Sequence, residues 1–334
     1  MIRLRYCAPA LAALAVAAAP ATAADAGTDA RQNAYPQRAI TLVVPFPAGG
    51  PSDALARGVA QHMGATLGQS VVVENVGGAG GTIGLQRVAR ATPDGYTLGF
   101  GTLGTHVANV AVYPKLPYDP LADFQPVGLA GSAPMLLLAR ADFPAGDLAQ
   151  FAAWLASKGD QATYGSAGVG SISHYGCVLL LSALKLPATH VPYRGVAPAI
   201  SDLMGGQTDF MCDQTTTSLP QIAGGRLKAI AVLSNQRLAQ LPDVGTAADA
   251  GYPLDARSWN AIFAPRGTPD GAMARLRLAL QAAVADAGFA AQMQAVGVDL
   301  PQGAAAGPQA VTTLIERGLR DDVPALKARQ EFLN

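Results

Sequence analysis

The sequence repeats one local pattern, and this pattern limits the possible folds more than any other feature. A short apolar run rich in β-branched residues is followed by a glycine- or proline-containing turn and then by a helical stretch. The first run covers residues 40–44 and stops at Pro45. Further strands are predicted at 71–73, 96–100, 162–164, 189–191, 227–233 and 261–263, and helices at 54–67, 148–158, 174–184 and 197–204. Strands that alternate with helices predict an α/β fold with mostly parallel sheets flanked by helices.

The length of the chain predicts two lobes. It has 334 residues, half of them apolar and 14% charged, so it can bury more than one small core. A helical tail at 272–285 and 311–327 has no sheet of its own, so we expect it to pack on the first lobe. We predict lobe 1 at 35–133 plus 256–334, lobe 2 at 134–255, a cleft between them, and a hinge near Ser132 and Arg257.

The first residues have the composition of a secretory signal peptide. Arg3 and Arg5 precede an apolar stretch at 8–19, and the sequence Ala21-Thr22-Ala23 resembles a cleavage site. We predict a signal peptide over 1–24, with cleavage near Ala23 and export of a soluble mature protein. The apolar stretch is shorter than the roughly 18 residues that a membrane-spanning helix needs.

Charge and cysteine content exclude several classes of partner. The 23 basic and 23 acidic side chains balance, so the chain lacks the basic surface of a nucleic-acid-binding protein. After removal of the signal peptide two cysteines remain, Cys177 and Cys212. Export permits a disulfide between them, and two separate buried thiols are an equally good interpretation. Their spacing and that of the four histidines fit no zinc site, so we predict no metal.

Candidate binding residues gather where predicted strands end, which is where open parallel sheets bind ligands. After the first strand come Gly49 and Gly50, with Asp53 in the first turn of a helix. After the second strand lies the glycine-rich segment 77–84, whose backbone can approach another surface closely. The third strand ends near Thr102 and Thr105.

The segment 164–174 is the richest of these loops. Its serines are Ser166, Ser171 and Ser173, and it leads into a helix. Hydroxyls and amides at a positive helix end predict a cradle for an anion such as a carboxylate. Each single serine is equally well explained as a helix cap. Tyr193 is a candidate cleft wall or hydroxyl donor, and Asp213 is a candidate contact for a ligand amine or hydroxyl.

A serine hydrolase is the enzymatic alternative. Ser171 or Ser173, His174 and Asp213 supply the residue types of a catalytic triad. However, no Gly-x-Ser-x-Gly motif occurs, and a serine directly before a histidine at a helix start is poorly placed to aim at its imidazole. We therefore expect a protein that holds a ligand without changing it.

Taken in order, these loops resemble the Bug-type receptors of tripartite tricarboxylate transporters. The similarity covers nearly the whole mature chain. The segments that carry it are 35–36, 43–53, 74–75, 78–81, 93–98, 113–120, 166–174, 190–195 and 241–244. One departure is the Val76-Gly77 pair after Asn75, where members of the family often have a basic residue.

The resemblance implies a two-lobed periplasmic binding protein of the Venus flytrap, type II-like, kind. It also implies a monomer without a cofactor that binds a small aliphatic or aromatic mono- or dicarboxylate and delivers it to the membrane components of such a transporter. The alternative is a binding protein that feeds a signalling system. The matching site residues are Phe46, Gly49, Gly50, Asp53, Thr102, Thr105, Ser166, Ala167, Gly168, Gly170, Ser171 and Ser173, with His174, Tyr193 and Asp213 as weaker matches.

Overall fold

The structure is a computed structural model that describes residues 35–328. The predicted signal peptide lies outside the described residues. One end of the molecule contains β1 (Ile40–Val44), β2 (Val71–Asn75) and β3 (Thr97–Thr102). Strand β1 pairs in parallel with both β2 and β3, as expected for βαβ units.

Two helices connect these three strands. Helix α2 (Pro51–Leu67) begins with a proline in its first turn and ends at Gly68, which adopts a left-handed conformation that glycine tolerates. Helix α3 (Thr82–Ala89) follows the glycine-rich segment after β2. Both helices therefore begin at the carboxyl end of a strand.

The other end of the molecule repeats this arrangement. Strand β5 (Thr163–Ser166) pairs in parallel with β6 (Thr189–Pro192) and β7 (Phe210–Gln214). The helices of this lobe are α5 (Leu148–Lys158), α6 (Ile172–Leu184), α7 (Val196–Met204) and α8 (Thr215–Ala223), and β8 (Leu227–Val232) completes its sheet.

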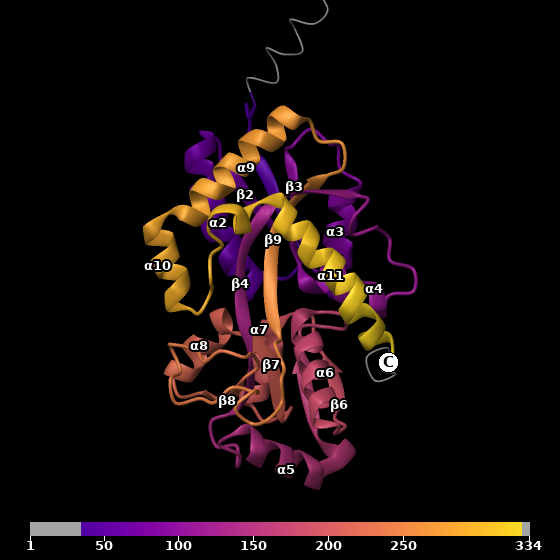
Figure 1. Ribbon diagram of the computed structural model, residues 1–334, viewed down its shortest axis with the longest axis vertical. Helices are drawn as coiled ribbons and strands as arrows, with labels where there is room; N and C mark the ends of the chain where they lie inside the picture. The colour runs from indigo at the N-terminus through magenta and orange to yellow at the C-terminus, as the bar shows by residue number, and fades with distance from the viewer. Residues whose placement is uncertain (1–34, 329–334) are drawn as a thin grey trace, which may run out of the picture.

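Two long strands join the lobes, and they run along the length of the molecule in Figure 1. Strand β4 (Phe124–Arg140) pairs with β9 (Arg257–Pro265) through its first part and with β7 and β8 through its second part. The continuous strand order is β2-β1-β3-β9-β4-β7-β5-β6. All pairings of β4 and β9 are antiparallel, and they join the parallel strands of the two lobes into one mixed sheet.

Strand β4 is not predicted from the sequence, because residues that disfavour central strands interrupt it. Pro126, Gly128, Gly131 and Pro134 all lie within it. Its pairing with β9 shifts register between Pro126 and Gly128 and again between Leu129 and Gly131. These irregularities accommodate the breakers without ending the strand.

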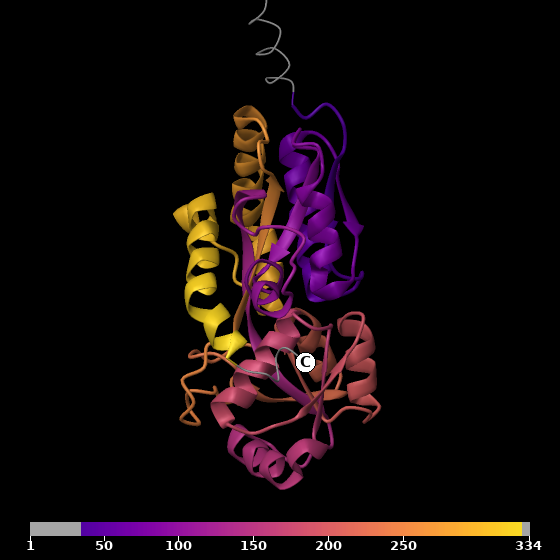
Figure 2. The same cartoon turned by 90° about the vertical axis from the view of Figure 1, so that its right-hand side faces the viewer.

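The C-terminal helices return to the first lobe, as Figure 2 shows. Helix α9 (Asp270–Ala285) packs on α2 and β4, and α10 (Ala287–Ala295) follows it. Helix α11 (Pro308–Lys327) packs on β4, on α4 (Asn109–Val112) and on the turn Gly104–Ala108. No helix within residues 35–328 combines the length and apolarity that a membrane crossing requires.

Candidate functional site: a cleft between the lobes

A cleft of about 770 Å³ lies between loops of both lobes. The first lobe contributes the turn after β1, the glycine-rich segment after β2, and Tyr113. The second lobe contributes the loops after β5 and β6. The lining residues are Phe46, Pro47, Asn75, Gly77, Gly78, Ala79, Gly80, Gly81, Ile83, Tyr113, Ala167, Gly168, Val169, Tyr193 and Arg194.

Glycine backbones bring the two lobes into contact beside this cleft. Gly80 has φ +58°, and a Cβ atom placed on it would lie 2.4 Å from the carbonyl oxygen of Val169. Tyr113 donates its hydroxyl to the same carbonyl at 3.2 Å. A Cβ on Gly104 would lie 2.9 Å from the Gly170 carbonyl oxygen. The close approach expected of the glycine-rich segment is therefore present, and its partner is the loop after β5.

The turn after β1 is held by Asp53 rather than left open. The Asp53 carboxylate accepts the Gly49 amide at 2.9 Å, the Asn75 side-chain amide at 2.9 Å and the Arg57 guanidinium at 3.0 Å. Burial alone would raise the pKa of Asp53, but these hydrogen bonds hold it below its usual value. Asp53, Gly49 and Gly50 shape the turn, and Phe46 is the predicted residue of this turn that lines the cleft.

Thr102 and Thr105 form a reciprocal cap at the end of β3. The Thr102 amide donates to Thr105 Oγ1 at 2.9 Å, and the Thr105 amide donates to Thr102 Oγ1 at 3.2 Å. Both side chains are buried, and neither lines the cleft. They fix the turn that carries Gly104 against the second lobe.

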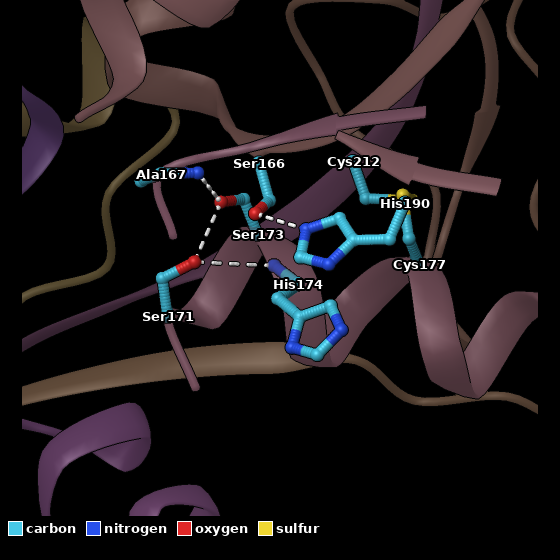
Figure 3. Close-up of a disulfide and its surroundings, with 8 residues drawn as sticks. All are labelled: Ser166, Ala167, Ser171, Ser173, His174, Cys177, His190 and Cys212. Atoms are coloured by element: carbon cyan, nitrogen blue, oxygen red, sulfur yellow. Dashed lines mark hydrogen bonds between the residues drawn. A yellow bond between two sulfur atoms is a disulfide. The ribbon is translucent and has the colours of Figure 1, made fainter. Parts of the chain in front are cut away.

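The loop after β5 is bonded internally, as Figure 3 shows. The Ala167 amide donates to Ser173 Oγ at 2.8 Å, and the Gly168 amide donates to Ser166 Oγ at 3.1 Å. Ser171 caps α6 by accepting the His174 amide at 3.3 Å. Ala167 and Gly168 line the cleft, whereas the three serines lie buried behind them. The serines therefore set the shape of the loop that faces the cleft.

Gly170 and His174 complete this internal network. The Gly170 amide donates to His174 Nδ1 at 3.2 Å, so that ring nitrogen carries no proton. Gly170 is buried and packs near Asn109 of the first lobe. Neither residue lines the cleft.

Two stacked histidines support the loop from behind, and sequence reasoning identified only one of them. The His174 and His190 rings lie 4.1 Å apart, and His190 Nε2 shares a hydrogen bond of 2.6 Å with Ser166 Oγ. Burial lowers the pKa of His190 to about 4 and that of His174 to about 2, so both rings are neutral near pH 7. His190 lies three residues before the candidate residue Tyr193, and this proximity is the sequence signal that points to His190.

A disulfide joins the helix behind the loop to the neighbouring strand. Cys177 of α6 is bonded to Cys212 of β7, with 5.3 Å between their Cα atoms. Of the two interpretations that the sequence allowed, a disulfide or two separate thiols, the structure contains the disulfide. Figure 3 shows this bond together with the serine and histidine side chains of the loop.

Asp213 follows Cys212 and is fully buried. The Thr217 hydroxyl donates to its Oδ2 atom, while its Oδ1 atom has no hydrogen-bond partner within residues 35–328. Burial raises the pKa of Asp213 to about 7, because the lost hydration outweighs the hydrogen bonds that favour the charged form. Asp213 does not line the cleft.

Tyr193 supplies a wall to the cleft. Its hydroxyl donates to Asp202 Oδ2 at 2.7 Å, which leaves the ring to face the space. Six further lining residues were not predicted as site residues from the sequence: Pro47, Asn75, Ile83, Tyr113, Val169 and Arg194. Several of them lie in segments that the sequence marks as candidate loops, but the tertiary structure decides which loops face one another.

The charge and polarity of the lining favour an anionic ligand. Within the described part of the chain no three His, Cys, Asp or Glu side chains converge as metal ligands. Arg194 is the one charged side chain among the described residues that line the cleft. Backbone groups, aromatic faces and a single cation are suited to an anionic small molecule.

Comparisons with known proteins agree with this geometry. Residues 55–327 match the family described as Tripartite tricarboxylate transporter family receptor. The structure of MatC from Rhodopseudomonas palustris with bound malate is 41% identical, with a TM-score of 0.83 over 86% of this chain and 99% of that one. An R. palustris protein with adipate is 32% identical, with a TM-score of 0.83 over 87% of this chain and 97% of that one.

A Bug protein is among these neighbours. The structure of the periplasmic binding protein BugD is 39% identical, with a TM-score of 0.83 over 88% of this chain and 98% of that one. The family match covers most of the chain, and these structures share both its sequence and its two-lobed α/β fold. The chain therefore belongs to the Bug-type receptors of the tripartite tricarboxylate transporter family.

Proposed function

We propose that this protein captures a small carboxylate in the cleft between its lobes and delivers it to the membrane components of a tripartite tricarboxylate transporter. The observation that carries the proposal is a cleft lined by backbone groups, aromatic rings and one cation, with no acidic side chain among its described lining residues. The malate and adipate bound to related proteins support the ligand class. The signal-like segment at 1–24 supports export to the periplasm.

The predicted site residues divide into two roles in this proposal. Phe46, Ala167, Gly168 and Tyr193 line the cleft and contact the ligand. The remaining members hold the loops in shape, and they are Gly49, Gly50, Asp53, Thr102, Thr105, Ser166, Gly170, Ser171, Ser173, His174 and Asp213. Substitution of the second group would then weaken binding through the loops.

The lobes of this proposal are residues 35–133 with 256–334, and residues 134–255. Strands β4 and β9 cross between them, with Ser132 opposite Trp259 and Pro134 opposite Arg257. A bend at these two strands opens and closes the cleft, and a ligand that contacts both lobes favours the closed form.

Binding rather than catalysis fits the buried hydroxyls. Ser166 is fully buried and bonded to both His190 and the Gly168 amide. Ser171 caps a helix, and His174 accepts a backbone amide. A substrate in the cleft would meet none of these hydroxyls directly.

A thermal-shift screen of the mature protein tests the ligand class. Each carboxylate is compared with its uncharged amide, using malate, succinate, adipate, terephthalate and nicotinate. A ligand at 100 times its Kd adds about 2.7 kcal/mol of stability, which raises the Tm by several degrees. We expect at least one acid to raise the Tm and its amide to have no effect. A screen without any response from the acids would contradict the proposal.

Uptake measurements test delivery to a transporter. Cells that lack the gene should lose uptake of the acid identified in the screen, and uptake should return when the gene is restored. Normal uptake in the deletion strain, together with altered expression of other genes on exposure to the acid, would favour a signalling role instead.

A further inference from the structure

Arg194 differs from every other described residue that lines the cleft. It follows β6 on the second lobe, its side chain is exposed, and it forms no ion pair with a described carboxylate. The acidic neighbour of its loop, Asp202, already accepts the Tyr193 hydroxyl at 2.7 Å. Arg194 therefore brings to the cleft a positive charge that no described carboxylate contacts in an ion pair.

The loop that carries Arg194 is held in place from both sides. Gly195 has φ +135°, and a Cβ on it would lie 3.0 Å from Cγ of Pro47 on the first lobe. The preceding residue, Tyr193, is anchored by its hydrogen bond to Asp202 and by its amide, which donates to the Ser166 carbonyl at 3.0 Å. The backbone of Arg194 is therefore fixed beside the place where the two lobes meet.

The lining residues of the cleft differ in exposure. Gly80 and Gly81 are buried, and Ala167 and Gly168 are half-buried, so neutral backbone groups and a small side chain form the less exposed lining. Arg194, Pro47 and Gly78 are exposed. A carboxylate beside the glycines is served by neutral donors, whereas the Arg194 guanidinium stays hydrated at the surface.

Part of the lining is apolar. Phe46, Tyr193 and Val169 line the cleft, and the Ile83 side chain also lines it while remaining 50% exposed. An apolar ligand body would cover these groups and bury part of Ile83. The space of about 770 Å³ also exceeds what a two- or three-carbon acid needs.

The geometry points to Arg194 as the residue that selects ligands with a second carboxylate. One carboxylate is held by backbone groups in either a mono- or a dicarboxylate. The second carboxylate meets Arg194 when the lobes close. This inference rests on the proposed function, and it adds the ligand class and the residue that distinguishes its members.

Matched acid pairs test the inference. Calorimetry compares adipate with hexanoate, succinate with butyrate, and terephthalate with benzoate on the wild type and on Arg194→Ala. We expect the variant to lose about three- to tenfold in affinity for the dicarboxylate that binds, because an exposed charge-assisted contact has this strength. Affinity for the matching monocarboxylate should change less than twofold. Arg194→Lys should restore part of the preference.

A control and an ionic-strength series sharpen the result. Arg226→Ala removes an exposed arginine that lies outside this cleft, so it should leave both affinities unchanged. The wild-type preference for the dicarboxylate should weaken in high salt, which screens exposed charges. Equal losses for both members of a pair in Arg194→Ala, or no loss for either, would overturn the inference while leaving the proposed function intact. Failure of all six acids to bind the wild type, together with no response to malate or nicotinate in the thermal-shift screen, would overturn both.

Discussion

His190 shows how one half-buried side chain makes the loop beside the cleft sensitive to pH. Its folded pKa of about 4 lies below its ordinary value of 6.5 because burial disfavours the charged ring. The unfolded chain therefore takes up a proton at a higher pH than the folded chain. The stabilising contribution of neutral His190 is complete above pH 6.5 and is lost as the pH falls toward 4.

Replacement of His190 by glutamine should reduce this acid sensitivity. The full shift corresponds to at most about 3 kcal/mol, so the wild type should lose more of its free energy of unfolding between pH 6.5 and 4 than His190→Gln does. Urea unfolding at a series of pH values measures this difference. Parallel curves for the two proteins would show that His190 does not titrate in this range.

Asp213 should change the stability with pH in the direction opposite to His190. Its folded pKa of about 7 is above the ordinary 3.8, so the unfolded chain releases the proton first as the pH rises. Its contribution is complete below pH 3.8 and is lost by about pH 7. Asp213→Asn cannot ionise, so we expect its stability relative to the wild type to rise between pH 4 and 7, by at most about 4 kcal/mol, and then to level off. Urea midpoints check this, and a constant difference would contradict it.

At the scale of elements, the disulfide ties the helix behind the loop to its neighbouring strand. It closes a chain segment of 35 residues, and cross-links of this length stabilise folded proteins by about 3–4 kcal/mol. The double variant Cys177→Ser/Cys212→Ser should lose that amount in urea unfolding. Reducing agent should lower the midpoint of the wild type and leave that of the double variant unchanged. An unaffected wild type would show that the bond adds no stability.

At the scale of the whole molecule, closure depends on the approach of Gly80 to the second lobe. Gly80→Ala places a methyl group against the Val169 carbonyl, so the lobes must separate by a fraction of an ångström or more. We expect at least a tenfold loss of ligand affinity, measured by calorimetry, and no ligand-induced compaction in X-ray scattering. Gly80 lies outside the apolar core clusters, so the circular dichroism spectrum should not change.

Gly225→Ala is the matched control for this variant. Gly225 has φ +65°, close to the +58° of Gly80, but a Cβ on it meets nothing within 4 Å. Both variants carry the same backbone strain, of roughly 1 kcal/mol, and only Gly80→Ala obstructs the lobe contact. Equal effects of the two variants on affinity would assign the loss to strain and would contradict a role in closure.

Local patterns were enough to predict most of the elements. The run at 40–44 became β1, and the helical stretch at 148–158 became α5. Strand β4 was not predicted because its prolines and glycines are typical of loops. Its pairing with three other strands compensates for these residues. Local backbone preferences determine where an element begins and ends. The existence of a strand that contains prolines and glycines depends on the strands that pair with it.

The sequence by itself determined the α/β class, the glycine-rich loops at strand ends and the family resemblance, because all three are properties of neighbouring residues. Only the tertiary structure decided that Gly80 meets Val169, that His190 supports Ser166, and that Arg194 is the charged residue at the cleft. These are relations between residues from about 20 to more than 100 positions apart, and local patterns carry no information about them. Chain folding brings such residues together, and the packing of the two lobes determines which of them face the ligand.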